Sequence, residues 1–283
     1  MRMSVSATAC AALLVAVGCG SDDSAPTSDT PAARAASGRS QTLDDVVKIT
    51  GDRGLYVRCT GTGSPTVVME GGDGDTSDSY AFAEAEVAKA TRTCTYDRAN
   101  LGRSGVAAGP RQLGDLVGDL ERLLRVAEIP GPYVLVGTSG GGYITVGYAS
   151  QHPREVAGLV FVDTGAPFAN PPEEIVEETD PDNPENVEKR DYLQVERDAW
   201  AARKRIGDIP VKIVTVKFSA EAIQESPFPA EQRLMRRNIA RQKGWLVLSP
   251  RAEQIVVTTG HAVEEDDPQL VIDVILDVVK DAR

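Results

Sequence analysis

The sequence predicts an α/β fold in which helices cover both faces of a mostly parallel, doubly wound sheet. Strand-like and helix-like stretches alternate along residues 43–283, which is typical of this class. Residues 132–143 (PYVLVGTSGGGY) predict a buried strand that passes through a tight glycine-rich turn into a helix. We therefore expect one α/β domain over residues 43–283.

Hydrophobic patterns place the elements of this domain in order. Short apolar, β-branched runs between turn residues predict strands, and apolar residues repeating every three to four positions predict helices. A leucine face at 111–127 is expected to pack on the sheet, and a terminal amphipathic helix follows Pro268 at 269–280. The predicted strands include 55–58, 93–96, 132–138, 159–162, 211–216 and 254–258.

The N-terminal residues predict export from the cell. Residues 1–18 begin with a positive charge, continue with an apolar stretch too short to span a bilayer comfortably, and precede Cys19. This signal peptide resembles that of a bacterial lipoprotein, which implies a lipidated Cys19 and anchoring at the outer face of the cell membrane. An ordinary secretory signal, giving a secreted protein, is the alternative. Residues 19–42 are polar and rich in Ser, Thr, Pro and Ala, so we expect a flexible tether.

Composition restricts the partners. The chain has 283 residues and a formal net charge of −12 at pH 7. Such a charge repels nucleic-acid phosphates and anionic lipid surfaces, so no nucleic acid is expected as a partner, and membrane contact is expected only through the lipid anchor. Anionic substrates are disfavoured for the same reason. No residue spacing suggests a metal site, and we expect no cofactor and a monomer.

Ser139 is the candidate nucleophile, because it lies in the Gly-x-Ser-x-Gly turn between the buried strand and the following helix. Such a turn holds the serine backbone in a strained conformation and presents its hydroxyl at the edge of the sheet. Gly137 and Gly141 would keep the neighbouring space clear. The five-residue pattern alone could also be a tight connection or an anion-binding loop.

A serine nucleophile needs a base, and the chain contains two histidines. His152 lies at the predicted end of the helix after Ser139, where a histidine before proline is most simply a helix cap. His261 follows the strand at 254–258, so it should emerge at the carboxyl edge of the sheet together with Ser139. His261 is therefore the candidate base.

Four separated patches, in this order, resemble the α/β-hydrolase family: VVMEGG at 67–72, YDRANLGRS at 96–104, GTSGG at 137–141, and Gly260-His261 with Pro268 after it. The resemblance implies a mostly parallel eight-stranded α/β-hydrolase sheet with a short helical cap insert.

The same resemblance implies an oxyanion hole formed by the backbone N–H groups of Gly72 and Gly140, which would stabilise a tetrahedral intermediate. The sequence departs from the family pattern at Glu70, where histidine is frequent, and at Asn100, where glycine is frequent.

Two acidic residues compete for the third position of a catalytic triad. Asp163 closes the strand at 159–162, and some family members carry their acid there. Glu221 follows the strand at 211–216, the more usual place, but the expected Asp is missing from that loop. We favour Asp163 because a strand end anchors it, although an Asp at this position is also common as a turn-stabilising residue.

The insert at about 165–208 is acidic and Pro-rich at first and is expected to be helical from about Glu185 to Arg205. In this family such an insert forms a cap over the nucleophile. Phe168, Tyr192 and Trp200, with Leu193 and Val195, are candidates for substrate contact, and packing of the insert onto the core is the alternative.

Cys59 and Cys94 remain as a pair once Cys10 and Cys19 are assigned to the N-terminal segment. Their predicted strands are the second and fourth, which are neighbours in the hydrolase sheet, so a disulfide is expected in an exported protein. Two buried thiols are the alternative.

The expected function is an exported serine hydrolase that cleaves carboxylic esters of small or medium size through an acyl-enzyme on Ser139, with His261 as base and then acid. An amide- or peptide-bond hydrolase of the same fold is the closest alternative, and a surface binding protein without turnover is another. Epoxide hydrolase and haloalkane dehalogenase chemistry are disfavoured, because those enzymes place a carboxylate at the position of Ser139.

Overall fold

A computed structural model describes residues 42–283 except 168 and 172. The expected signal peptide, the lipidation site Cys19 and nearly all of the tether lie outside the described residues, and so does Phe168.

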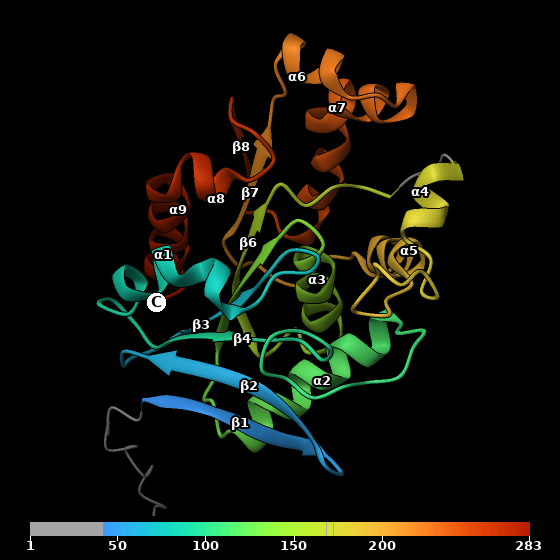
Figure 1. The fold of residues 1–283 in the computed structure, drawn as a ribbon. Coiled ribbons are helices and arrows are strands. Elements are labelled where there is room, and N and C mark those ends of the chain that lie inside the picture. Colours follow the sequence, from blue (N-terminus) through green and yellow to red (C-terminus); the bar gives the residue numbers. More distant parts are fainter. Residues whose placement is uncertain (1–41, 168, 172) are drawn as a thin grey trace, which may run out of the picture. The chain divides into compact units, whose positions relative to one another are not determined.

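An eight-stranded sheet forms the centre of the fold, with strand order β1-β2-β4-β3-β5-β6-β7-β8 (Figure 1). Strand β2 pairs antiparallel with β1 and β4, and the remaining neighbours are parallel. The predicted fold class is therefore confirmed. The strands are β1 (Leu43–Thr50), β2 (Arg53–Thr60), β3 (Thr66–Glu70), β4 (Thr93–Tyr96), β5 (Tyr133–Thr138), β6 (Val156–Val162), β7 (Val211–Val216) and β8 (Ala252–Val257).

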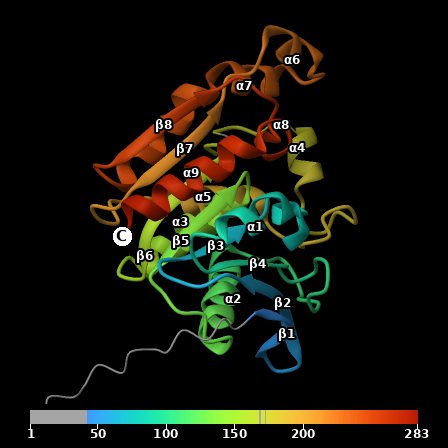
Figure 2. The ribbon, with the colours of Figure 1, turned by 90° about the vertical axis from the view of Figure 1, so that its left-hand side faces the viewer.

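Helices cover both faces of the sheet, as Figures 1 and 2 show. Helices α2 (Leu113–Val126), α3 (Gly141–Gln151) and α5 (Tyr192–Ala202) pack together on one face, and α1 (Ala81–Val87) and α9 (Pro268–Asp281) lie on the other. No helix in the described part of the chain is long and apolar enough to cross a membrane. The other helices are α4 (Glu173–Glu178), α6 (Ala220–Glu225), α7 (Pro229–Gln242), α8 (Val263–Asp266) and the 3₁₀ turns η1 (Ser77–Tyr80) and η2 (Lys243–Leu248).

The hydrophobic core is divided into two clusters by the sheet, because successive strand residues point to opposite faces. In β5, Tyr133 and Leu135 belong to the cluster under α2 and α3, whereas Val134 and Val136 belong to the cluster under α9. The leucine face of α2 is buried as predicted, at Leu113, Leu116, Leu120, Leu123 and Leu124.

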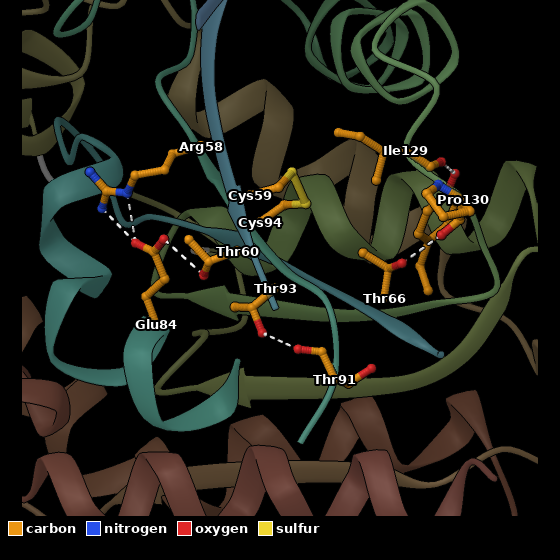
Figure 3. Close-up of a disulfide and its surroundings, with 11 residues drawn as sticks. Arg58, Cys59, Thr60, Thr66, Glu84, Thr91, Thr93, Cys94, Ile129 and Pro130 are labelled. Atoms are coloured by element: carbon orange, nitrogen blue, oxygen red, sulfur yellow. Dashed lines mark hydrogen bonds and ion pairs between the residues drawn. A yellow bond between two sulfur atoms is a disulfide. The ribbon is translucent and has the colours of Figure 1, made fainter. Parts of the chain in front are cut away.

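A disulfide joins Cys59 and Cys94 (Figure 3), which confirms the expected pairing. The two cysteines are directly opposite each other in the antiparallel β2–β4 pair, and both are buried. The neighbouring Arg58 contributes an ion pair with Glu84 of α1 at 2.6 Å. The disulfide thus links the hairpin formed by β1 and β2 to β4, the first of the parallel strands.

The insert between β6 and β7 contains less helix than expected. Helix α5 begins at Tyr192 and not near residue 185. The preceding residues form turns in which the Asn186 side-chain amide donates to the carbonyl of Arg190, and Lys189 has a positive φ of 54°. These side chain–backbone bonds and this left-handed residue are incompatible with a continuous helix.

Candidate active site

Ser139 lies at the turn between β5 and α3 with a positive φ of 47°. Its N–H donates to the carbonyl of Val162 at the end of β6, at 2.8 Å. A Cβ added at Gly141 would overlap the carbonyls of Glu70 and Gly71, so only glycine permits this approach of the β3 end. The strained nucleophile turn expected from the sequence is therefore present.

His261 follows β8 and lies beside Ser139. Its Nε2 is 3.1 Å from Ser139 Oγ, and its Nδ1 is 2.7 Å from Asp163 Oδ2. An Nδ1–H donating to the carboxylate leaves Nε2 with the lone pair that a general base needs. The side chain of His261 is 55% exposed, so the base can be reached from solvent.

Asp163 is the acid that the structure brings to His261. It follows β6, is 4% exposed and has a φ of 47°. Its Oδ1 accepts from the Asn238 and Gln242 side chains of α7 at 2.8 and 2.6 Å, and from the Val216 N–H at 3.1 Å.

Glu221, the competing acid, is exposed in the first turn of α6, and it is Asp163 that contacts His261. The sequence pattern gave no signal for Asn238 and Gln242, which lie in a polar helix far along the chain. Their donors occupy Oδ1 of Asp163 and leave Oδ2 for the imidazole.

Hydrogen bonding sets the charge states of this pair. The hydrogen bond that His261 donates to Asp163 raises the pKa of His261 above its ordinary value, and its effect exceeds the opposing effect of burial. Burial alone would raise the pKa of Asp163, but the hydrogen bonds from His261 and Asn238 and the Val216 N–H hold it below its ordinary value. Asp163 therefore stays ionised and stabilises an imidazolium at His261.

His152 ends α3, as expected from the sequence, and does not join this group. Its N–H donates to the Tyr148 carbonyl, its ring lies 4.6 Å from the Tyr148 ring, and its side chain faces Glu121 and Glu155. His152 therefore has a structural environment at the end of the helix.

The turn after β3 differs from expectation at Gly72. The N–H of Gly72 donates to Asp75 Oδ2 at 2.8 Å, because residues 72–75 form a closed turn in which the Asp75 N–H also returns to the Gly72 carbonyl. Within the described residues, the backbone N–H groups of Asp73 and Gly140 have no acceptor. The donors available to an oxyanion are thus those of Asp73 and Gly140.

A buried ion cluster fixes the turn after β3. Arg98, which follows β4, pairs with Glu70 and Glu188 at 2.8 Å each, and donates to the carbonyls of Gly71 and Gly72. Glu70, where the family often has histidine, thus serves as the partner of Arg98. Burial alone would raise the pKa of Glu188, but Arg98 outweighs it and lowers this pKa to about 2, so Glu188 remains ionised.

The insert is attached to the core through Glu188. Glu188 Oε1 accepts from the Gly74 N–H at 2.8 Å, and its carbonyl accepts from the Asn100 side chain at 3.1 Å. Asn100, the second departure from the family pattern, thus helps to hold the insert. The sequence does not reveal Arg98 and Glu188 as partners, because 90 residues separate them.

Carboxylates surround the site. Glu264 of α8 and Asp73 both contribute to the raised pKa of His261. Glu196 of α5 has a pKa raised to about 7, first by burial and then by the charge of Asp73. The side-chain Oε2 atoms of Glu196 and Glu264 are buried without a hydrogen-bond partner. Negative charge from Asp73 and Glu264 thus acts on His261, whereas Glu196 is only partly ionised near pH 7.

The expected substrate contacts have different environments. The Tyr192 ring lies under the Arg190 guanidinium at 4.8 Å. Trp200 packs edge-on against Trp245 at 4.7 Å and under Arg203 at 3.7 Å, so it has the environment of a packed side chain.

In residues 42–283, with 168 and 172 left aside, no group of three or more His, Cys, Asp or Glu could hold a metal ion.

Comparisons with known proteins agree with this fold. The model of the alpha/beta hydrolase fold family matches residues 65–211. The protein YqjL of Bacillus subtilis is 26% identical over 230 residues, which cover 77% of this chain and 85% of the relative.

Two solved structures show the same fold. A thermophilic esterase from Thermogutta terrifontis superimposes with a TM-score of 0.62 at 20% identity, covering 86% of this chain and 99% of that one. The enol-lactonase of Burkholderia xenovorans LB400 also gives 0.62, at 14% identity, covering 83% and 99%. The chain belongs to the alpha/beta hydrolase fold family.

Proposed function

We propose that the protein is a serine hydrolase that cleaves carboxylic ester bonds through an acyl-enzyme on Ser139. The observation that carries this proposal is the continuous hydrogen-bonded line from Ser139 Oγ through His261 to Asp163, at 3.1 and 2.7 Å. This is the arrangement by which a base activates a weakly nucleophilic hydroxyl.

The reaction follows from these positions. His261 Nε2 takes the proton of Ser139 as Oγ attacks the ester carbonyl, and the N–H groups of Asp73 and Gly140 stabilise the resulting oxyanion. His261 then gives the proton to the leaving alcohol, and the acyl group stays on Ser139. A water activated by the same imidazole releases the acid and restores the hydroxyl.

We expect small or medium, uncharged or cationic esters as substrates. The charges of Asp73 and Glu264, which act on His261, together with the formal net charge of −12, disfavour anionic esters. The insert is expected to limit which acyl and alcohol groups enter, with Tyr192 close to the Arg190–Asp73 pair.

Hydrolysis of p-nitrophenyl esters of increasing acyl length, by wild type and Ser139→Ala, tests the proposal. We expect a chain-length optimum in the wild type and a loss of at least about 10³-fold in kcat in the variant, because Ser139 supplies the attacking oxygen. Glu221→Gln is the matched control and should keep its activity. Equal rates in wild type and Ser139→Ala would contradict the proposal.

We further propose that the chain is exported and lipidated at Cys19, with the membrane contacted only through the lipid, and that the enzyme acts as a monomer. The support is the resemblance of residues 1–18 to a lipoprotein signal. Expression in bacteria with an alkyne-labelled fatty acid should label the wild type and not Cys19→Ser. Equal labelling of both, or none of either, would contradict lipidation at this residue.

A further inference from the structure

Arg190 connects the two loops that carry the unpaired N–H groups. Its side chain is 1% exposed, its Nη1 donates to Asp73 Oδ1 at 2.6 Å, and its Nη2 donates to the Gly140 carbonyl at 3.4 Å. One guanidinium, supplied by the insert, thus contacts both residues that we propose as oxyanion donors.

Asp73 and Gly140 are in direct contact. A Cβ added at Gly140 would overlap the Asp73 carboxylate, so this carboxylate occupies the space that any other residue would fill with its side chain. The turn after β3 and the nucleophile turn therefore touch through one carboxylate, and Arg190 holds that carboxylate in place. A fixed guanidinium fork restricts both position and orientation.

The insert in turn fixes Arg190. Asn186 accepts from the Arg190 N–H and donates to its carbonyl, at 3.3 and 2.8 Å. Arg190 forms a parallel β-bridge with Arg111, and its guanidinium stacks on the Tyr192 ring. Nothing in this arrangement requires substrate, so the contact is formed before the reaction begins.

We propose that Arg190 is a positioning residue that sets the separation and orientation of the two oxyanion donors. This inference rests on the proposed function. The proposed role of Arg190 means that the insert helps to stabilise the transition state, in addition to its expected role as a cap. Because such donors act only on the charge that develops in the transition state, their misplacement lowers kcat and leaves substrate binding nearly unchanged.

The test compares Arg190→Met, Arg190→Lys and Asp73→Asn with wild type on the best ester. Loss of one oxyanion donor costs about 10²–10³-fold in kcat, so a misplaced pair should cost roughly 10- to 100-fold in Arg190→Met with KM within about twofold. The Ki of a trifluoromethyl ketone analogue, which forms a tetrahedral oxyanion with Ser139, should rise by the same factor. Arg190→Lys should recover part of the loss.

Arg53→Met is the matched control, because Arg53 makes a comparable two-point ion pair with Asp119, at 2.5 and 2.8 Å. It should lower the melting temperature without changing kcat or Ki. If Arg190→Met does not fold, the kcat of Arg190→Lys and Asp73→Asn and their Ki for the ketone analogue test the role of Arg190.

Variants that keep the wild-type kcat and Ki, or that lose activity through KM alone, would overturn the role of Arg190. Absence of any Ser139-dependent turnover in the wild type would instead overturn the proposed function.

Discussion

His261 determines the pH dependence of the proposed reaction. The hydrogen bond that His261 donates to Asp163 raises the pKa of His261 above 6.5, because the carboxylate stabilises the charged imidazolium. The base must be neutral to accept a proton, so kcat/KM should rise with pH and reach half its maximum above pH 6.5. A pH profile of kcat/KM measures this directly. A midpoint clearly below 6.5 would contradict the pairing.

The assignment of Asp163 as the acid leads to a second prediction. Asp163→Asn leaves the shape of the group but removes the charge and favours the wrong tautomer of His261, so kcat should fall by about 10⁴-fold, as in other triads. Glu221→Gln, an exposed residue on α6, should stay near wild type. A kcat near wild type in Asp163→Asn, with a large loss in Glu221→Gln, would exclude Asp163 as the acid of the triad.

For single residues, the sequence predicts the triad candidates that follow strand ends. It does not predict the side chains that hydrogen-bond to them. Ser139, Asp163 and His261 follow three parallel strands whose carboxyl ends lie at the same edge of the sheet, so the topology places all three at that edge. Asn238 and Gln242 lie on one face of a helix, and helical periodicity does not reveal what they contact. The Gly72 N–H is not free for the donor role expected of it, because the Asp75 side chain accepts from it. We propose Asp73 in its place.

Among the elements, the β2–β4 pair carries the disulfide and gives a stability prediction. The bridge closes a loop with a sequence separation of 35 residues. Its loss in Cys59→Ser/Cys94→Ser should lower the free energy of unfolding by about 3–4 kcal/mol through the entropy of the unfolded chain. Because the bridge makes no contact with the triad, kcat should not change. Denaturant unfolding that is unaffected by reductant would contradict this role.

The insert is the element that the sequence describes least well. Its acidic, Pro-rich composition predicts an excursion between two strands, which the structure contains. The start of α5 at Tyr192, and the burial of Glu188 and Arg190, depend on partners that are distant in sequence, such as Arg98 and Asp73. Charged residues in an acidic segment normally predict a solvated surface, and here two of them are buried because they pair.

For the whole molecule, charge should select among substrates. The net charge of −12 and the carboxylates near His261 attract cations. Of two p-nitrophenyl esters of equal length, one ending in a trimethylammonium group and one in a carboxylate, the cationic ester should show the higher kcat/KM. The difference should shrink with added salt, because exposed charges are screened. Preference for the anionic ester would show that local groups override the net charge.

Intact-mass measurement after treatment with a fluorophosphonate shows whether Ser139 is a nucleophile activated by His261. Attack by Oγ on phosphorus expels fluoride and leaves one stable adduct. We predict a single adduct that maps to the peptide containing Ser139 and is absent from Ser139→Ala. A folded wild type that stays unmodified, or an adduct at another residue that persists in Ser139→Ala, would contradict the account.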